Sequence, residues 1–325
     1  MRATASYLLA LVLWAGLLAP AGAQDTARGW LERMIRATQT LSYEGTFIYI
    51  HGQAVDIMAI LHSNQDGQGR QRMYSLSGPR REVLVNDGQV MCLLPDRRFA
   101  FRISRFERSP FPISFPNDLD RLAQSYEFDL AGADRVLDRP AQIVSVRPRD
   151  DMRYGYRLWL DRATGLVLRS ALVGESQDQY LEQLVFTELN IRDRIDPQRL
   201  LPSAPDQALL KTVALQQEPS ASVEPNWRAE SLPPSFVQVM YQPHGTDDQS
   251  RATHQLVFSD GLATVSVFVE PLVDEPLLQG ASHMDAMNTY GVVLDDRYQV
   301  IAVGEVPVKT VAKIASSIVT IDPER

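Results

Sequence analysis

Apolar and polar residues alternate most clearly over positions 255–270, QLVFSDGLATVSVFVE. The dipeptide Asp260-Gly261 readily supplies the positive φ angles of a two-residue hairpin turn, so we expect two antiparallel strands in which Ser259 faces Leu262. This register collects one apolar face, formed by Leu256, Phe258, Ala263, Val265, Val267 and Val269. The pattern predicts a half-buried hairpin, and its periodicity alone indicates no function.

A helical period begins near the N-terminus, where Thr26 can cap a helix. Its apolar face follows the i, i+3, i+4 spacing at Trp30, Leu31, Met34, Ile35, Thr38 and Leu41. Further along, we expect the strands Tyr43–Ile50, Val55–Leu61, Tyr126–Leu130, Gln142–Val146, Tyr156–Leu160, Leu166–Val173 and Leu181–Ile191, and a short helix at Asp118–Gln124. Many strands with one long helix predict a strongly curved antiparallel sheet or an unclosed β-barrel, a shape that commonly encloses an apolar cavity.

The C-terminal part predicts a smaller α+β domain. We expect a strand at Phe236–Tyr241, the hairpin of residues 255–270, a helical stretch at Ser282–Met287, a hairpin of Tyr290–Leu294 and Tyr298–Val303, and a last helix from Pro307 that buries Val308, Val311, Ala312, Ala315 and Ile318. Prolines and polar residues before this part are typical of a linker. The predicted organisation is therefore an N-terminal domain of residues 24–201, a linker of residues 202–226 and a C-terminal domain of residues 227–325.

Residues 1–23 have the features of a cleaved signal peptide. Arg2 precedes an apolar run over residues 7–18, and Ala21-Gly22-Ala23 has the small-x-small pattern that a signal peptidase recognises. No later segment has the roughly 18 continuous apolar residues of a membrane span, so we expect a soluble, exported chain. The formal charge of −8 argues against a generic nucleic-acid binder, so we expect no nucleic-acid partner.

The sequence offers no catalytic motif. It contains no GxSxG elbow, Walker loop, HExxH, CxxC or GxGxxG sequence. Its five histidines lack metal-ligand spacing, His254 falls on the apolar face of the hairpin, and Asp150-Asp151 falls in a predicted turn. Cys92 lies in an apolar run and predicts a buried, inert thiol. We therefore expect no catalytic residue, no metal site and no cofactor.

Binding surfaces remain as the candidate sites. Residues 70–108 contain nine arginines against four acidic residues, and arginine forks suit phosphate groups. Aromatic residues on strands could line a cavity, although core packing and solvated charge explain most such residues. The candidate lipid-binding residues are Phe47, Tyr49, Arg97, Arg98, Arg102 and Arg105, and the candidate partner-binding residues are Phe258, Val265 and Val267.

Four ordered segments resemble one known family: LSYEGTFIYIHG, SLSGPRREVLVNDGQVMCLLP, SDGLATVSVFVE and VIAVGEVPVKTVAKIASSI. Together with the leader, they resemble the RseB/MucB family of periplasmic sigma-factor regulatory proteins. The resemblance implies a lipoprotein-carrier-like, unclosed barrel followed by a smaller domain. It also implies a negative regulator of the envelope stress response, linked in some members to alginate regulation.

By the same resemblance, the protein should bind the periplasmic domain of a transmembrane anti-sigma factor and protect it from site-1 proteolysis. Lipid or lipopolysaccharide should release that partner. The alternative functions are a periplasmic lipid or lipoprotein carrier and an exported hydrolase, and a homodimer is left open. A carrier needs only the barrel, so the second domain favours the regulator, and a hydrolase lacks its catalytic residues.

Overall fold

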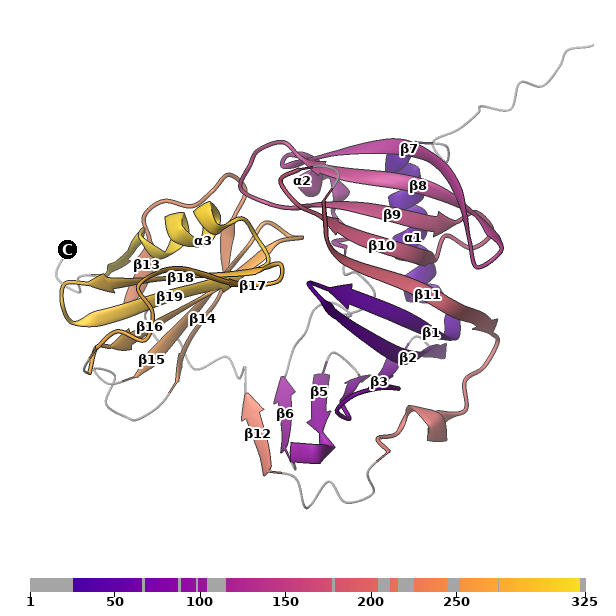
Figure 1. Ribbon diagram of the computed structural model, residues 1–325, viewed down its shortest axis with the longest axis horizontal. Coiled ribbons are helices and arrows are strands. Elements are labelled where there is room, and N and C mark those ends of the chain that lie inside the picture. Colours follow the sequence, from indigo (N-terminus) through magenta and orange to yellow (C-terminus); the bar gives the residue numbers. More distant parts are fainter. Residues whose placement is uncertain are drawn as a thin grey trace, which may run out of the picture.

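The computed structural model describes residues 26–65, 68–86, 89–97, 99–103, 115–176, 179–203, 211–215, 225–244, 252–273 and 275–321. They form two β-rich domains, seen side by side in Figure 1. The predicted signal peptide lies outside these ranges. No helix within them is long and apolar enough to cross a membrane.

One twelve-stranded sheet forms the N-terminal domain. Its strands are β1 (Ser42–His51), β2 (Ala54–Gln65), β3 (Gln68–Ser75), β4 (Glu82–Asn86), β5 (Gln89–Leu94), β6 (Phe99–Ile103), β7 (Tyr126–Val136), β8 (Arg139–Pro148), β9 (Gly155–Asp161), β10 (Val167–Val173), β11 (Tyr180–Arg192) and β12 (Lys211–Leu215). The order is β12-β6-β5-β4-β3-β2-β1-β11-β10-β9-β8-β7, so β7 and β12 are edge strands that do not pair with each other. The prediction of an unclosed, mainly antiparallel sheet is confirmed.

Helix α1 (Ala27–Thr40) covers part of this sheet (Figure 1). The Thr26 side chain accepts a hydrogen bond from the Gly29 amide at 3.0 Å, which confirms the predicted N-cap. The predicted apolar face packs with α2 (Leu119–Ala123) and with residues of β7, β8 and β9. Within the domain core, Leu31, Val144, Leu158 and Leu160 are fully buried.

The range predicted as a linker contains the strand β12, which pairs in parallel with β6. The described residues of the domain also include two short 3-10 helices, η2 (Pro95–Arg97) and η3 (Pro197–Leu200). The chain between the domains therefore returns to the edge of the first sheet before it enters the second domain.

The C-terminal domain is a six-stranded antiparallel sheet with helix α3 on one face (Figure 1). Its strands are β14 (Val237–His244), β15 (Thr253–Ser259), β16 (Thr264–Pro271), β17 (Gly280–Met284), β18 (Met287–Leu294) and β19 (Tyr298–Gly304), and β13 (Trp227–Ala229) pairs separately with β20 (Ile318–Thr320). Helix α3 (Val308–Ala315) begins after Pro307, as predicted, and buries Val311 and Ala315. Val308 was predicted on the same face, but it lies in the first turn and is 43% exposed, and Ile318 lies in β20, after the helix has ended.

The helical stretch predicted at Ser282–Met287 is wrong. These residues end β17 and begin β18, and they pair as a tight hairpin. Asp285 adopts a left-handed backbone conformation, with φ 55°, at the turn. Such a turn favours Asp, Asn or Gly, and it reverses the chain before a helix can form.

The β15–β16 hairpin has the predicted faces but a different turn. Ser259 pairs with Thr264 and Phe258 with Val265, so the loop has four residues, 260–263, instead of two. The difference in register is two residues, which leaves each side chain on its predicted face because the strand period is two. Leu256, Phe258, Val265, Val267 and Val269 are all buried in the core of the domain.

We predict that Phe258→Ala lowers the free energy of unfolding by about 3–5 kcal/mol, because it leaves a cavity in the C-terminal core. Chemical denaturation monitored by circular dichroism measures the change. Val239→Ala is the matched control on the edge strand, since Val239 is 59% exposed. Equal stability of the two variants would contradict this account of the core.

Candidate functional site

The loop of the β15–β16 hairpin inserts into the N-terminal domain. Leu262 packs against the core cluster that holds α1, α2 and β7–β9. Gly261, with φ 107°, lies so close to the first domain that a Cβ built there would be 3.7 Å from Pro116 Cγ. The stretch with the clearest strand pattern in the sequence therefore also forms part of the domain junction.

A buried ion pair lies beside this loop. Arg153, in the connection between β8 and β9, places Nη1 at 2.5 Å from Asp260 Oδ2, and neither side chain is exposed to solvent. The Tyr126 hydroxyl donates to the same carboxylate oxygen at 3.0 Å. The other oxygen, Asp260 Oδ1, accepts the amides of Leu262 and Ala263, each at 2.8 Å. One carboxylate thus shapes its own loop and binds the opposite domain.

Arg153 is held from both domains. Its Nε and Nη2 donate to the two oxygens of Asp150 at 3.0 Å, and Nη2 also donates to the Pro234 carbonyl at 2.8 Å. The guanidinium carbon lies 5.6 Å from the Tyr126 ring centroid and 5.1 Å from that of Phe236. Burial raises the pKa of Tyr126 well above its usual value, so the phenol remains a donor. The arginine is therefore paired, hydrogen-bonded and stacked at once, as a buried charge requires.

Neighbouring residues of the same β8–β9 connection make further contacts with the second domain. The buried Thr310 hydroxyl, on α3, donates to the Met152 carbonyl at 2.6 Å. Asn288, on β18, donates to the Tyr154 hydroxyl at 3.0 Å. The connection between β8 and β9 is thus the main element of the N-terminal domain that binds the C-terminal domain.

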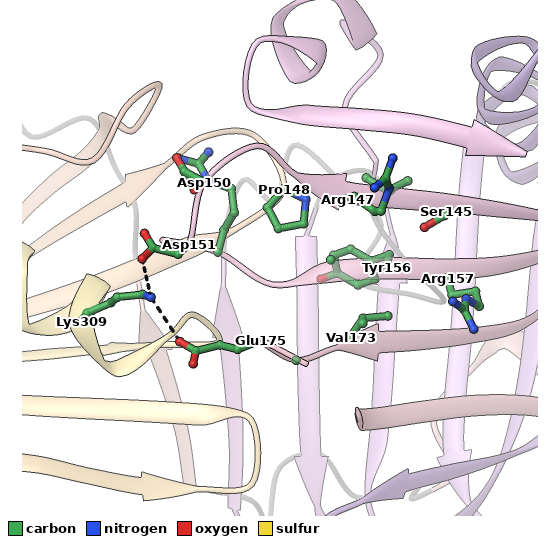
Figure 2. A pocket seen from close by; sticks show the side chains of 14 residues that line it. Ser145, Arg147, Pro148, Asp150, Asp151, Tyr156, Arg157, Val173, Glu175 and Lys309 are labelled. Carbon is green, nitrogen blue, oxygen red and sulfur yellow. Dashed lines mark hydrogen bonds and ion pairs between the residues drawn. The ribbon is translucent and has the colours of Figure 1, made fainter. Parts of the chain in front are cut away.

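A pocket of about 270 Å³ opens at this junction. Figure 2 shows Lys309, on α3, between Asp151 and Glu175 of the N-terminal domain, and its Nζ lies 2.8 Å and 3.4 Å from their carboxylate oxygens. The hydrogen bond with Asp151 raises the pKa of Lys309, and the same contact lowers the pKa of Asp151. Opposite charges are therefore neutralised across the mouth of the pocket.

The pocket has the chemistry of a binding or docking surface. Its described lining includes Arg147 and Arg157 as further cations, and it contains no histidine or cysteine that could act as a base or thiol nucleophile. In the described part of the chain, no group of three His, Cys, Asp or Glu side chains could hold a metal ion. The arrangement can bind charged groups and hold the two domains together.

Two family models together match most of the chain. The model described as the MucB/RseB N-terminal domain matches residues 26–204, and the model described as the MucB/RseB C-terminal domain matches residues 221–319. The chain belongs to the MucB/RseB family.

Curated members of this family resemble the chain over nearly its whole length. It is 35% identical over 331 residues to the sigma factor AlgU regulatory protein MucB of Pseudomonas aeruginosa, covering 98% of each chain. It is 27% identical over 305 residues to the sigma-E factor regulatory protein RseB of Escherichia coli K12, covering 92% of each chain. Curated relatives of this MucB/RseB chain are thus named as regulatory proteins.

Solved MucB structures share its fold. The complex of Pseudomonas aeruginosa MucA and MucB matches with a TM-score of 0.73 at 31% identity, over 91% of this chain and 99% of that chain. A crystal structure of MucB matches with a TM-score of 0.64 at 33% identity, over 90% of this chain and 97% of that chain. The two-domain architecture is therefore shared with MucB.

The structure does not bring all the predicted lipid-binding residues together. Phe47 is buried against Phe186, with ring centroids 5.7 Å apart, and the Tyr49 hydroxyl donates to Glu182. Arg97 is exposed in η2, and Arg102 lies on β6, which four strands separate from β1 in the sheet order. Arg98 and Arg105 lie outside the described residues, as does the side chain of Arg102.

The predicted partner-binding residues Phe258, Val265 and Val267 are buried in the C-terminal core. A partner could contact these side chains only if that domain opened. His254 lies in the core as predicted, with Nδ1 at 2.9 Å from the Tyr241 hydroxyl. Cys92 was predicted to be buried but is only partly buried; even so, burial raises the pKa of its thiol to about 11, which disfavours a reactive thiolate.

None of the residues of the domain junction was predicted as a site residue from the sequence. Turn chemistry accounts locally for Asp150, Asp151 and Asp260, so their sequence context gave no sign of a second role. Arg153 and Asp260 lie 107 positions apart, a separation that local pattern cannot connect. The one local signal is that Arg153 follows Asp150-Asp151 in the same predicted turn.

We predict that Arg153→Met destabilises the docked arrangement by about 3–5 kcal/mol, because it leaves Asp260 buried without its cation. Thermal unfolding of the whole protein should then separate into two transitions as the domains unfold independently. Lys309→Met is the matched control at the exposed edge of the junction, and it should cost less than about 1 kcal/mol. A single transition of unchanged midpoint for Arg153→Met would refute the assignment.

Proposed function

We propose that this protein is a periplasmic regulator that binds the periplasmic domain of a transmembrane anti-sigma factor. By holding that domain it protects it from site-1 proteolysis and keeps the sigma factor inactive. It acts by binding and not by catalysis, and residues 1–23 direct its export. Lipid or lipopolysaccharide releases the partner.

The observation that carries this proposal is the relationship along the whole chain to MucB, which has been crystallised with the periplasmic part of MucA. That structure, of MucB in complex with MucA(peri), matches with a TM-score of 0.71 at 31% identity and covers 91% of this chain. Both domains are included, so a partner surface that uses either domain, or both, is available in this protein.

The domain junction supports a regulator over a simple carrier. A carrier requires a cavity, which the first sheet alone could provide. Here the second domain is docked through the buried pair Arg153–Asp260, with neither side chain exposed. A built junction of this kind allows a ligand in one domain to change a surface in the other, provided that the ligand prefers one domain arrangement.

Lipid sensing by the arginine-rich segment is the finer part of the proposal. A phosphorylated lipid has apolar tails and an anionic head, so its receptor needs an apolar cavity with cations at the mouth. The first sheet is unclosed and carries Phe47 and Tyr49 on the same strand face, and the arginine-rich β5–β6 region follows further along the sheet. We propose that one lipid contacts both Phe47 and Tyr49 on β1 and the arginines near β6. Such a lipid must extend across the strands that lie between them in the sheet.

We predict that the protein, at saturating concentration, slows cleavage of a purified anti-sigma periplasmic domain by its site-1 protease. Binding removes the cleavage site from the protease, so the rate should fall in proportion to the bound fraction. Gel-based cleavage assays measure it, and cleavage of an unrelated unfolded substrate serves as the control for the protease itself. Equal cleavage with and without the protein would refute the proposal.

We predict that changing Arg97, Arg98, Arg102 and Arg105 together to Gln leaves the fold intact but weakens release of the partner by anionic lipid. Each lost head-group contact should cost on the order of 1 kcal/mol or more. Lipid is titrated against the preformed complex at two salt concentrations.

The control variant removes four exposed, paired arginines elsewhere, Arg28, Arg192, Arg199 and Arg228, whose side chains are 43–53% exposed. It lowers the net charge equally. Identical release curves for the wild type and both variants would show that the segment has no part in sensing.

A further inference from the structure

A second polar contact joins the domains at the end of β1, away from Arg153. His51 Nδ1 lies 2.9 Å from Asp285 Oδ2, and Asp285 belongs to the β17–β18 turn of the C-terminal domain. His51 Nε2 lies 3.3 Å from Asp56 Oδ2, on β2 of its own domain. Each ring nitrogen therefore faces a carboxylate, one from each domain.

This geometry selects the charged form of the imidazole. A neutral imidazole has one N–H and one lone pair, so it can donate to one carboxylate only and turns its lone pair toward the other. The imidazolium ion donates to both. Loss of the proton must therefore break one contact or place a lone pair against an oxygen, and the interdomain contact is one of the two at risk.

The β1–β2 turn and the β17–β18 turn approach so closely that the position of Gly52 has no room for a side chain. Gly52, with φ 53°, lies under Asp285, and a Cβ built on Gly52 would be 1.8 Å from Asp285 Oδ1. Asp285 itself has φ 55°. The β1–β2 turn and the β17–β18 turn are thus shaped to bring the Asp285 carboxylate onto His51.

The charged groups around His51 come from both domains. Arg81 pairs with Asp56 at 2.5 Å, and the Tyr49 ring stacks on the imidazole with centroids 5.0 Å apart. Burial would raise the pKa of Asp56, but the hydrogen bonds from Arg81 and His51 outweigh it and lower that pKa. The hydrogen bond with Asp285 is the main cause that raises the pKa of His51, against the opposing effect of burial.

Two further carboxylates lie near this cluster. Glu182 accepts the Tyr49 hydroxyl, and Glu305 precedes α3 in the C-terminal domain. Desolvation at the junction, with the charge of Glu182 second, raises the pKa of Glu305 to about 7. The Glu305 side chain is exposed to solvent, which weakens both effects. His51 therefore makes the larger contribution to the pH dependence of the domain contact.

We propose that the His51–Asp285 contact is a proton-operated latch between the two domains, closed when His51 is charged and loosened when it is neutral. The histidine pKa is higher in the docked state than in an undocked one. Docking is therefore fully supported below the ordinary histidine pKa of about 6.5, and this support is lost as pH rises through the docked value. Ionisation of Glu305 beside Glu182 acts in the same direction.

The test is a distance measurement within the whole protein, with no partner present. Donor and acceptor dyes are attached at Arg135→Cys in the first domain and Val273→Cys in the second, in a Cys92→Ser background. Both sites are exposed, at 73% for the Arg135 side chain and 85% for Val273. Energy transfer is recorded from roughly pH 5.5 to 8.5, a range that brackets the ordinary histidine pKa.

The expected result is a shift from a docked to a less docked population as pH rises. His51 alone should change their ratio by up to about tenfold per pH unit over the titration, the limit for one linked proton. His51→Gln and Asp285→Asn should each remove most of this pH dependence. Asp295→Asn, at a comparable turn residue with φ 53° in the β18–β19 hairpin, should keep it.

Two results would overturn the proposal. One is transfer that does not change with pH in the wild type, and the other is a full wild-type pH dependence in Asp285→Asn. If His51→Gln failed to fold, as judged by circular dichroism, Asp285→Asn would decide alone, because it changes only a turn at the surface of the second domain. Since no partner is used, failure here is distinct from failure of the proposed function.

Discussion

The arrangement of the two domains depends on a charge that has no solvent around it. Arg153 and Asp260 are both fully buried, and each would carry a large desolvation cost without the other. Tyr126 also donates a hydrogen bond to Asp260, and Arg153 donates to Asp150 and to the Pro234 carbonyl. All these bonds can form together in only one relative placement of the two domains. Apolar contacts tolerate sliding, but a displaced ion pair of this kind would leave buried charge unpaired. The buried ion pair therefore fixes the relative orientation of the two domains more than the size of their contact does.

The solvent exposure of the junction increases with distance from this ion pair. Leu262 packs into the first core, Thr310 is buried, and Lys309 lies at the solvent-exposed edge between two carboxylates. Exposed ion pairs contribute little to stability, so the central contacts hold the domains and the peripheral ones adjust them. A change at the exposed edge can therefore alter the docking while both cores stay folded.

Local pattern in the sequence was sufficient for much of the fold. The period of two placed Phe258 and Val267 on the correct face even though the turn was two residues longer than predicted, and the Thr26 cap placed the start of α1. The site was a different matter. Asp260 reads as a turn residue because Asp-Gly needs no other explanation, and its partner Arg153 comes from another domain. Contacts between residues so far apart in the sequence produce no periodic pattern in it. The periodic pattern identifies buried strand faces instead, so most candidate residues taken from those faces lie in the core.

The strand β12 has a consequence for how far the domains can separate. It pairs with β6 at the edge of the first sheet, so eleven residues of the chain lie between the end of β12 at Leu215 and the start of β13 at Trp227. A chain of that length reaches about 40 Å when fully extended. A C-terminal domain that left its docking surface would therefore stay near it, at an effective concentration on the order of millimolar. Redocking would be an intramolecular step whose rate does not depend on the concentration of the protein.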